Sequence, residues 1–171
     1  MTEQELVSII TEAFPVTPVP PADGLIEHYM GEEAARFLGG RQWCDVIEDL
    51  WTVNRDGETL ISLSPTAFSY YLPAYLLATL EHQGSEWFVG FLLSALYPPE
   101  WMGPAALEKW QRRMNMLNPL QRNAVRQVLE YLVDNPSVDG ASEVQDVSQL
   151  RMALANYWGF QGSDVNSTEG G

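Results

Sequence analysis

The stretch that decides the fold reads Ser64-Pro65-Thr66-Ala67-Phe68-Ser69-Tyr70-Tyr71-Leu72-Pro73-Ala74-Tyr75-Leu76-Leu77-Ala78-Thr79-Leu80. Ser64 is a good helix cap and Pro65 fits the first helical position, so a helix is expected to begin here. Apolar side chains recur at helical spacing, and other apolar residues fill the opposite side. Because a helix that is apolar all round is usually buried, we expect residues 65–80 to form a buried central helix.

Pro73 lies in the middle of this predicted helix. A proline has no backbone N–H, so the carbonyl of Ser69 loses its usual donor and the helix is expected to kink. Packing of the kinked helix among its neighbours is one interpretation, and a ligand site at the kink is the alternative. A membrane span is disfavoured, because the run holds three tyrosines and falls short of the ~20 apolar residues that a span needs.

The remaining chain carries the signals of further helices. Thr2-Glu3-Gln4-Glu5 is a capping box that opens a first helix, whereas Gly103-Pro104 and Asn118-Pro119 open two later ones. Apolar periodicity predicts helices near 3–14, 24–38, 43–51, 65–80, 85–96, 104–117, 119–134 and 143–158.

Three finer expectations accompany this pattern. We interpret residues 59–63 as extended chain, because the run is short and β-prone and no partner strand is evident. Leu120 is expected to face the core. Lys109, Arg112 and Arg113 form the densest basic cluster in the sequence, on the outer face of their helix, where pairing with the acidic half of the chain is expected.

Length and composition bound the class of protein. The chain has 171 residues, of which 46% are hydrophobic, so it can bury a core and is expected to be globular. We predict an all-α fold, with about seven to eight helices in one compact domain over 1–161 and a flexible polar tail at 162–171. The single cysteine, Cys44, fits a reducing compartment. No secretory signal is evident, so the cytoplasm is the expected location.

The charge is strongly negative and uneven. The net charge is −14; residues 1–86 hold 14 acids and 3 arginines, giving −11, whereas residues 87–171 hold 9 acids and 6 basic residues, giving −3. Nucleic-acid phosphates require Lys and Arg, so direct nucleic-acid binding is disfavoured. The acidic balance favours a partner protein with a basic surface, and solubility alone is the competing explanation.

The central stretch resembles the signature of a family of uncharacterised bacterial proteins, whose members carry a segment reading roughly Thr-Pro-Glu-Ala-Phe-Arg-Tyr-Tyr-Leu-Pro-Ala-Tyr-Leu. Here that segment runs from Ser64 to Leu76. The later run Val128-Leu129-Glu130-Tyr131-Leu132 is also similar to the family. This sequence has Thr66 where the family usually has Glu, and Ser69 where it usually has Arg. The resemblance implies a helical fold and brings no established activity.

The two histidines raise the question of a metal site. His28 and Glu32 are four residues apart, as are His82 and Glu86, and side chains at this spacing on one helix can bind a common ion. Glycines within or beside both pairs weaken the helical geometry, and no HExxH motif occurs. We therefore expect no metal and no other cofactor.

Sequence signatures of catalysis are also missing. Cys44 lies between Trp43 and Asp45, and a reactive thiolate needs a cationic neighbour, so we interpret Cys44 as a small core or boundary residue. The chain has no Gly-x-Ser-x-Gly elbow, no P-loop and no Gly-x-Gly-x-x-Gly motif. A non-enzymatic role is therefore favoured, while an enzymatic one stays open.

The first functional hypothesis is protein binding. Its most concrete form is an immunity-type inhibitor that occludes a basic effector or toxin, such as a nuclease. A separate hypothesis is a DNA-mimic inhibitor, in which spaced carboxylates imitate phosphates and bind a DNA-binding protein. The predicted binding face consists of acidic residues of the N-terminal half, namely Glu27, Glu32, Glu33, Asp45, Glu48, Asp49, Asp56 and Glu58.

The second hypothesis is a small-ligand-binding protein or an enzyme with a pocket at the Pro73 kink. Tyrosine hydroxyls inside an apolar pocket can orient a ligand. The residues predicted to line such a pocket are Tyr70, Tyr71, Pro73, Tyr75 and His82.

Overall fold

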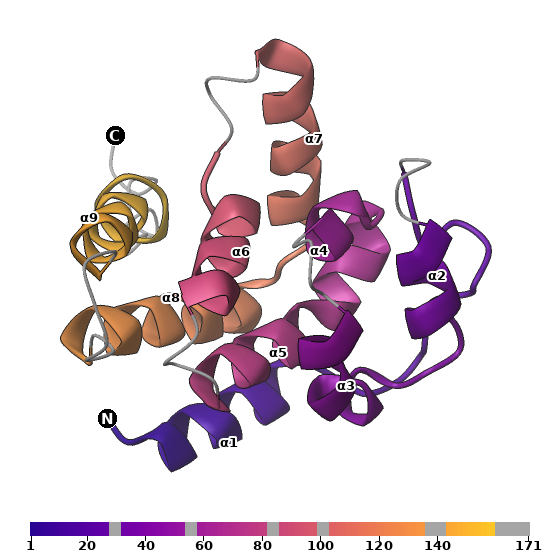
Figure 1. Cartoon of the computed structure of the whole chain (residues 1–171), viewed down its shortest axis with the longest axis horizontal. Coiled ribbons are helices and arrows are strands. Elements are labelled where there is room, and N and C mark those ends of the chain that lie inside the picture. The colour runs from indigo at the N-terminus through magenta and orange to yellow at the C-terminus, as the bar shows by residue number, and fades with distance from the viewer. Residues whose placement is uncertain (28–31, 54–57, 82–85, 99–102, 136–142, 160–171) are drawn as a thin grey trace, which may run out of the picture.

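The computed structural model describes residues 1–27, 32–53, 58–81, 86–98, 103–135 and 143–159. It describes the backbone alone at 32–34, 51–53, 58, 86–88 and 143–147. Within these ranges the fold is all-α, as the sequence predicts, with nine α-helices and no strand (Figure 1). In the same ranges, no helix is both long and apolar enough to cross a membrane.

Along the chain, the longest separation between successive helices is the 18 residues between α1 and α2. Between α2 and α3 lies a 3-10 helix, η2, and α9 continues into a π-helical turn, η4. The elements are α1 (Glu3–Ala13), α2 (Glu32–Leu38), η2 (Trp43–Asp45), α3 (Ile47–Val53), α4 (Glu58–Ser62), α5 (Pro65–Glu81), α6 (Glu86–Leu96), α7 (Pro104–Asn115), α8 (Pro119–Asp134), α9 (Glu143–Ala153) and η4 (Leu154–Trp158).

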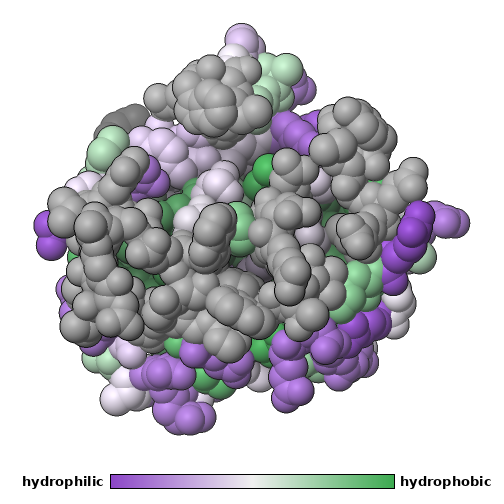
Figure 2. Space-filling model, in the orientation of Figure 1, coloured by the Kyte–Doolittle hydropathy of each residue, from purple (hydrophilic) through white to green (hydrophobic). Residues whose placement is uncertain are grey.

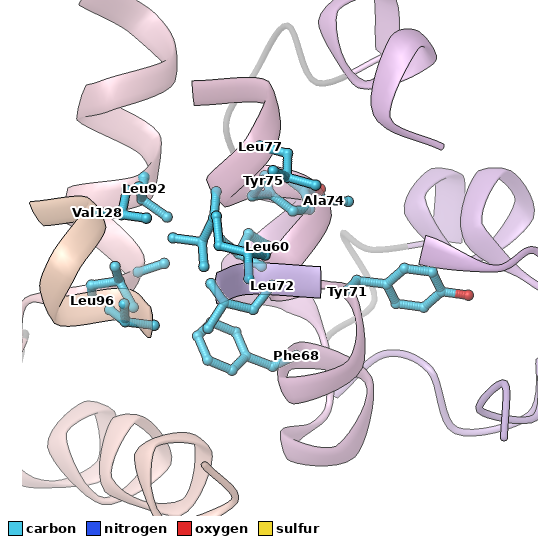
Figure 3. Close-up of a cluster of buried hydrophobic side chains, with 14 of the residues drawn as sticks. Leu60, Phe68, Tyr71, Leu72, Ala74, Tyr75, Leu77, Leu92, Leu96 and Val128 are labelled. Carbon is cyan, nitrogen blue, oxygen red and sulfur yellow. The ribbon is translucent and has the colours of Figure 1, made fainter. Parts of the chain in front are cut away.

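Helix α5 is the centre of the molecule, as predicted. It packs against α1, α3, α4, α6, α7 and η2, which surround it in Figure 1. Every residue from Tyr71 to Leu80 is buried. The close-up in Figure 3 shows Phe68 and Leu72 on the side of α5 that faces Leu92 and Val128. Burying one such side chain stabilises the fold by about 2 kcal/mol, so the all-round apolarity of α5 accounts for its central position.

Local capping fixes where two of the helices begin. The hydroxyl of Thr2 accepts from the backbone N–H of Glu5 at 3.3 Å, and the Glu5 carboxylate accepts from the N–H of Thr2 at 2.6 Å. Asn118 and Gln121 make the same reciprocal pair at 2.9 and 3.0 Å before α8. Each box satisfies two N–H groups that a helix start leaves without partners, which confirms both predicted starts.

The prediction of one helix over 24–38 is wrong for residues 24–27. Gly24 adopts a positive φ of 85°, and the next residues run alongside the start of α5. Ile26 forms an isolated antiparallel bridge with Leu63, and the N–H of Glu27 donates to the Ser62 carbonyl at 3.0 Å. Because this backbone is paired with a distant segment, residues 25–27 are not helical, and the described helix α2 begins at Glu32.

The prediction that 59–63 is extended is also wrong, because residues Glu58–Ser62 form the short helix α4. Leu60 is fully buried, and α4 packs against α5 and α6. A five-residue apolar run does not distinguish a buried helix from a strand by its periodicity, so only the packing decides. Leu63 alone is extended, opposite Ile26.

Two further details differ from expectation. The helix predicted over 43–51 is divided, since η2 ends before α3 begins; its apolar residues Trp43, Val46 and Leu50 are nevertheless buried. Leu120, predicted to face the core, is 68% exposed. The buried stripe of α8 starts at Gln121, and the preceding residue is rotated by about 100° on a helix, which turns Leu120 to the surface.

Candidate functional site

Three of the predicted acidic residues lie close together on η2 and α3. Asp45 is the last residue of η2, and Glu48 and Asp49 occupy the first turn of α3. All three side chains are exposed. We call these three residues the η2–α3 acidic face. In Figure 2, hydrophilic residues gather along the lower edge of the view, over α1 and α3.

Arg41 neutralises one residue of this face. Its guanidinium donates to the Asp49 carboxylate at 2.7 Å and to the backbone carbonyl of Asp45 at 2.6 Å. The same guanidinium lies 4.9 Å from the centre of the Phe37 ring. Among the described residues, Asp45 and Glu48 have no ion pair, so their carboxylates keep their full charge at the surface.

Glu27 lies elsewhere and faces α7. Its carboxylate Oε2 is 3.8 Å from the Lys109 ammonium and 3.6 Å from the Arg112 guanidinium, and its side chain is only 23% exposed. The expected pairing of the basic cluster with the acidic half is therefore confirmed for Lys109 and Arg112. Glu27 is engaged within the molecule and is not part of the η2–α3 acidic face.

The other four predicted acidic residues have no described side chain. Glu32 and Glu33 begin α2, and Glu58 begins α4, with the backbone alone described. Asp56 lies outside the described residues. The structure thus brings together Asp45, Glu48 and Asp49 and separates them from Glu27.

Arg113 is buried, which corrects its predicted place on the outer face of its helix. Only 4% of the residue is exposed. Its guanidinium donates to the backbone carbonyls of Leu63 and Ile61, at the end of α4, and lies 5.7 Å from the Phe68 ring. Burial lowers the pKa of Arg113 to about 10. Sequence reasoning missed this contact, although Arg113 precedes the buried Met114 and a 100° rotation leaves it on the edge of the apolar stripe.

Two more arginines of the C-terminal half also bond within the fold. Arg122 donates to the backbone carbonyls of Leu117 and Met114, which end α7. Arg126 pairs with Glu130 at 2.6 Å. Arg122 and Arg126 thus bond to carbonyls and one local carboxylate, and neither pairs with a described carboxylate of the N-terminal half.

The tyrosines of the predicted pocket have different partners. The Tyr70 hydroxyl donates to the carbonyl of Val16, and the Tyr71 hydroxyl lies 2.7 Å from the Leu38 carbonyl and 2.9 Å from that of Arg41. Mainly because Tyr71 is buried, its pKa is raised to about 12. Both hydroxyls therefore tie α5 to segments that precede it in the chain.

Tyr75 points elsewhere in the core. It is 1% exposed, and its hydroxyl forms no hydrogen bond of normal geometry with the residues that the structure describes, although the Thr59 side chain lies near it. Burial raises the pKa of Tyr75, and the neighbouring Thr59 side chain opposes the rise. Figure 3 shows Tyr71 directed away from the group of Ala74, Tyr75 and Leu77. Pro73 is buried inside α5, and the helix continues beyond it to Glu81. His82 lies outside the described residues.

Cys44 is exposed, so the expectation of a core or boundary cysteine is wrong. Its sulfur lies 3.7 Å from Oε1 of Gln42 and 3.8 Å from Oδ1 of Asp45. Trp43 takes the buried position instead, and its indole N–H donates to the Pro15 carbonyl at 3.3 Å. Adjacent residues of η2 point in different directions, which places the large ring inside and the thiol outside.

Comparison with known proteins places the chain in a family. No curated protein and no solved structure matches it. A family model does match, over residues 2–161, and its description is "Family of unknown function (DUF6714)". The resemblance to an uncharacterised family that the central stretch indicates is thereby confirmed. Since the match covers far more than half of the sequence, the chain belongs to this family of unknown function, DUF6714.

Proposed function

We propose that this protein binds a partner protein with a basic surface, most concretely as an immunity-type inhibitor that occludes a basic effector such as a nuclease. One observation carries the proposal: Asp45 and Glu48 are exposed on neighbouring short helices and, among the described residues, have no ion pair. Such carboxylates can form charge-assisted hydrogen bonds with Lys and Arg of a partner.

The charge distribution supports this proposal. The chain carries a net charge of −14, and −11 of it belongs to residues 1–86. Arg113 and Arg122 are bonded to backbone carbonyls, and Lys109 and Arg112 face Glu27. In the described part of the chain, none of these four cations forms an ion pair with Asp45 or Glu48, so these two carboxylates contribute to the negative field of the N-terminal half. A field of this kind accelerates encounter with a basic protein and orients it.

The support beneath the η2–α3 acidic face also favours binding. Trp43, Val46 and Leu50 lie under the two helices and are at most 2% exposed. Both helices pack against α5. Carboxylates on a fixed backbone lose little conformational freedom when a partner docks, so less of the interaction energy is lost to ordering.

A charge-reversal pair tests the proposal. The protein is co-expressed with the products of its neighbouring genes, and complexes are recovered by pull-down. The double variant Asp45→Lys and Glu48→Lys is expected to lose the complex, because it replaces attraction by repulsion. The matched control, Glu108→Lys with Asp134→Lys, changes the net charge equally at exposed positions on α7 and α8 and is expected to keep the complex.

Two results would contradict the proposal. If no neighbouring gene product forms a complex, the immunity-type role is rejected. If both double variants weaken a complex equally, the interaction depends on net charge alone, and the η2–α3 acidic face is not the binding site.

A second function is favoured by one observation, the buried Tyr75 hydroxyl, which forms no hydrogen bond of normal geometry among the described residues. A buried polar group usually has a hydrogen-bond partner, and a small ligand with an acceptor group would supply one. A thermal-shift screen of small molecules, with metal analysis of the purified protein, tests this alternative. A ligand that stabilises the wild type and not Tyr75→Phe supports it, whereas the lack of any shift argues against it.

A further inference from the structure

A second charged site lies on α7. Its side chains are positively charged, although the whole protein is acidic. We propose that Lys109 and Arg112, backed by Arg113, bind a phosphate group of a small molecule beside Glu27. The inference is independent of the proposed protein-binding function, since it involves neither η2 nor α3. Figure 1 shows α7 and α3 at different ends of the molecule.

Lys109 and Arg112 are neighbours on the surface of α7, and Arg113 is buried beside them. Lys109, Arg112 and Arg113 are spaced i, i+3 and i+4 on α7, and side chains at these spacings are neighbours. Glu27 contacts two of them through a single oxygen, Oε2. Their charges therefore act on one region of space.

The ion pairs of Glu27 are longer than the other ion pairs that the structure describes. The two N···O distances are 3.8 Å to Lys109 and 3.6 Å to Arg112. The Arg41–Asp49 and Arg126–Glu130 pairs are at 2.7 and 2.6 Å. A charged hydrogen bond is normally about 2.7–2.9 Å long, so the contacts of Glu27 with Lys109 and Arg112 are longer than such bonds.

The charge of the cluster is not balanced. Three cations and the one carboxylate that contacts them among the described residues leave a net +2. Burial lowers the pKa of Lys109, and the neighbouring Arg113 lowers it further, while Glu27 raises it. A phosphate monoester carries about −1.5 to −2 at neutral pH, which matches the excess, whereas a carboxylate neutralises only half of it.

The site is both accessible and fixed. The Arg112 side chain is 55% exposed and that of Lys109 is 26% exposed, so an anion can reach both. Arg113 is anchored behind them by its bonds to the Leu63 carbonyl. The bridge between Ile26 and Leu63 holds the neighbouring Glu27 against the same segment. Donors that are positioned before binding cost less to order.

An NMR titration tests the site, with inorganic phosphate as the probe. Amide resonances of the full chain are followed at low, constant ionic strength, and sodium acetate is titrated in parallel. Phosphate is expected to shift resonances of α7 around residues 109–113. Acetate is expected to bind more weakly, because it carries a single charge.

Three variants identify the residues. Arg112→Gln and Lys109→Gln each remove a cation and are expected to weaken phosphate binding about tenfold, the size of one charged hydrogen bond. Glu27→Gln removes the competing carboxylate and is expected to tighten binding several-fold. Arg151→Gln, at an exposed position on α9, is the matched control and is expected to change nothing.

Each other result overturns the proposal. If phosphate shifts no resonance of α7, there is no site. If Arg112→Gln and Arg151→Gln weaken binding equally, the anion is attracted by scattered surface charge. If acetate binds as tightly as phosphate, the cluster does not select phosphate. The amide spectra also show whether each variant is folded, so a failure to fold is not mistaken for a loss of binding.

Discussion

The guanidinium of Arg113 donates to the backbone carbonyl of Leu63 through Nε at 3.2 Å and through Nη2 at 3.0 Å. The two residues are 50 positions apart in the sequence. This contact fixes α7 to the junction between α4 and α5, where helix α4 ends and leaves carbonyls without intrahelical donors. The charged side chain of Arg113, from a distant helix, thus caps the end of α4.

Replacing Arg113 by methionine tests the importance of this contact. Arg113→Met places an unbranched apolar side chain there and removes the donor from the buried carbonyl of Leu63 and the partly buried carbonyl of Ile61. The free energy of unfolding is expected to fall by about 2–4 kcal/mol, measured by urea denaturation. Arg112→Met, at the exposed neighbouring position, is expected to change it by less than about 0.5 kcal/mol. Equal effects of the two substitutions would contradict the role assigned to Arg113.

Tyr71 predicts a dependence of stability on alkaline pH. Its pKa is about 12 in the folded protein, against about 10 in an unfolded chain. The folded state therefore holds the phenolic proton more tightly, and this contribution to stability is complete below pH 10 and is lost as the pH rises through 12. The stability advantage of the wild type over Tyr71→Phe should shrink across that interval. An advantage that stays constant from pH 9 to 12 would be inconsistent with the buried, neutral hydroxyl.

Replacing Tyr75 by phenylalanine is expected to affect stability differently from Tyr71→Phe. The Tyr75 hydroxyl is buried and forms no hydrogen bond of normal geometry among the described residues, so its removal is expected to cost little hydrogen-bond energy. Tyr75→Phe is expected to leave the free energy of unfolding unchanged or to raise it by up to about 1 kcal/mol. Thermal or urea denaturation measures the change. A loss of stability like that of Tyr71→Phe would mean that the hydroxyl has a partner, which favours the ligand hypothesis.

Removing the capping box of α8 is expected to lower the stability of the protein. In Asn118→Ala the N–H of Gln121 loses its acceptor, and the free energy of unfolding is expected to fall by about 1 kcal/mol. Asn115→Ala, at an exposed position in the last turn of α7, provides the control and is expected to have little effect. The prediction fails if both substitutions destabilise the protein by the same amount.

Local signals made the helix starts and the central helix predictable. Thr2, Ser64 and Asn118 act on N–H groups within three residues of themselves, and such contacts depend on few other parts of the chain. The near-continuous apolarity of 65–80 identifies the most buried helix without reference to its partners. The exposed trio of Asp45, Glu48 and Asp49 follows from the polar side of an amphipathic pattern.

Several of the errors lie where distant segments meet. Residues 25–27 were expected to be helical, but their backbone pairs with 62–64, and α4 forms beside them instead of extended chain. Arg113 and Glu27 were both expected on the outside. Each faces another element instead: Arg113 the carbonyls of α4, and Glu27 the basic side chains of α7.

The sequence by itself determined the all-α class, the central position of α5 and the acidic surface, because helix caps, apolar periodicity and net charge act locally or add up over the whole chain. Only the tertiary structure decided which charges are free at the surface. Asp45 and Glu48 remain without ion pairs among the described residues, while Glu27 is drawn to α7 and Arg113 is buried. Such pairings join residues many positions apart, and their geometry exists only once the helices have packed.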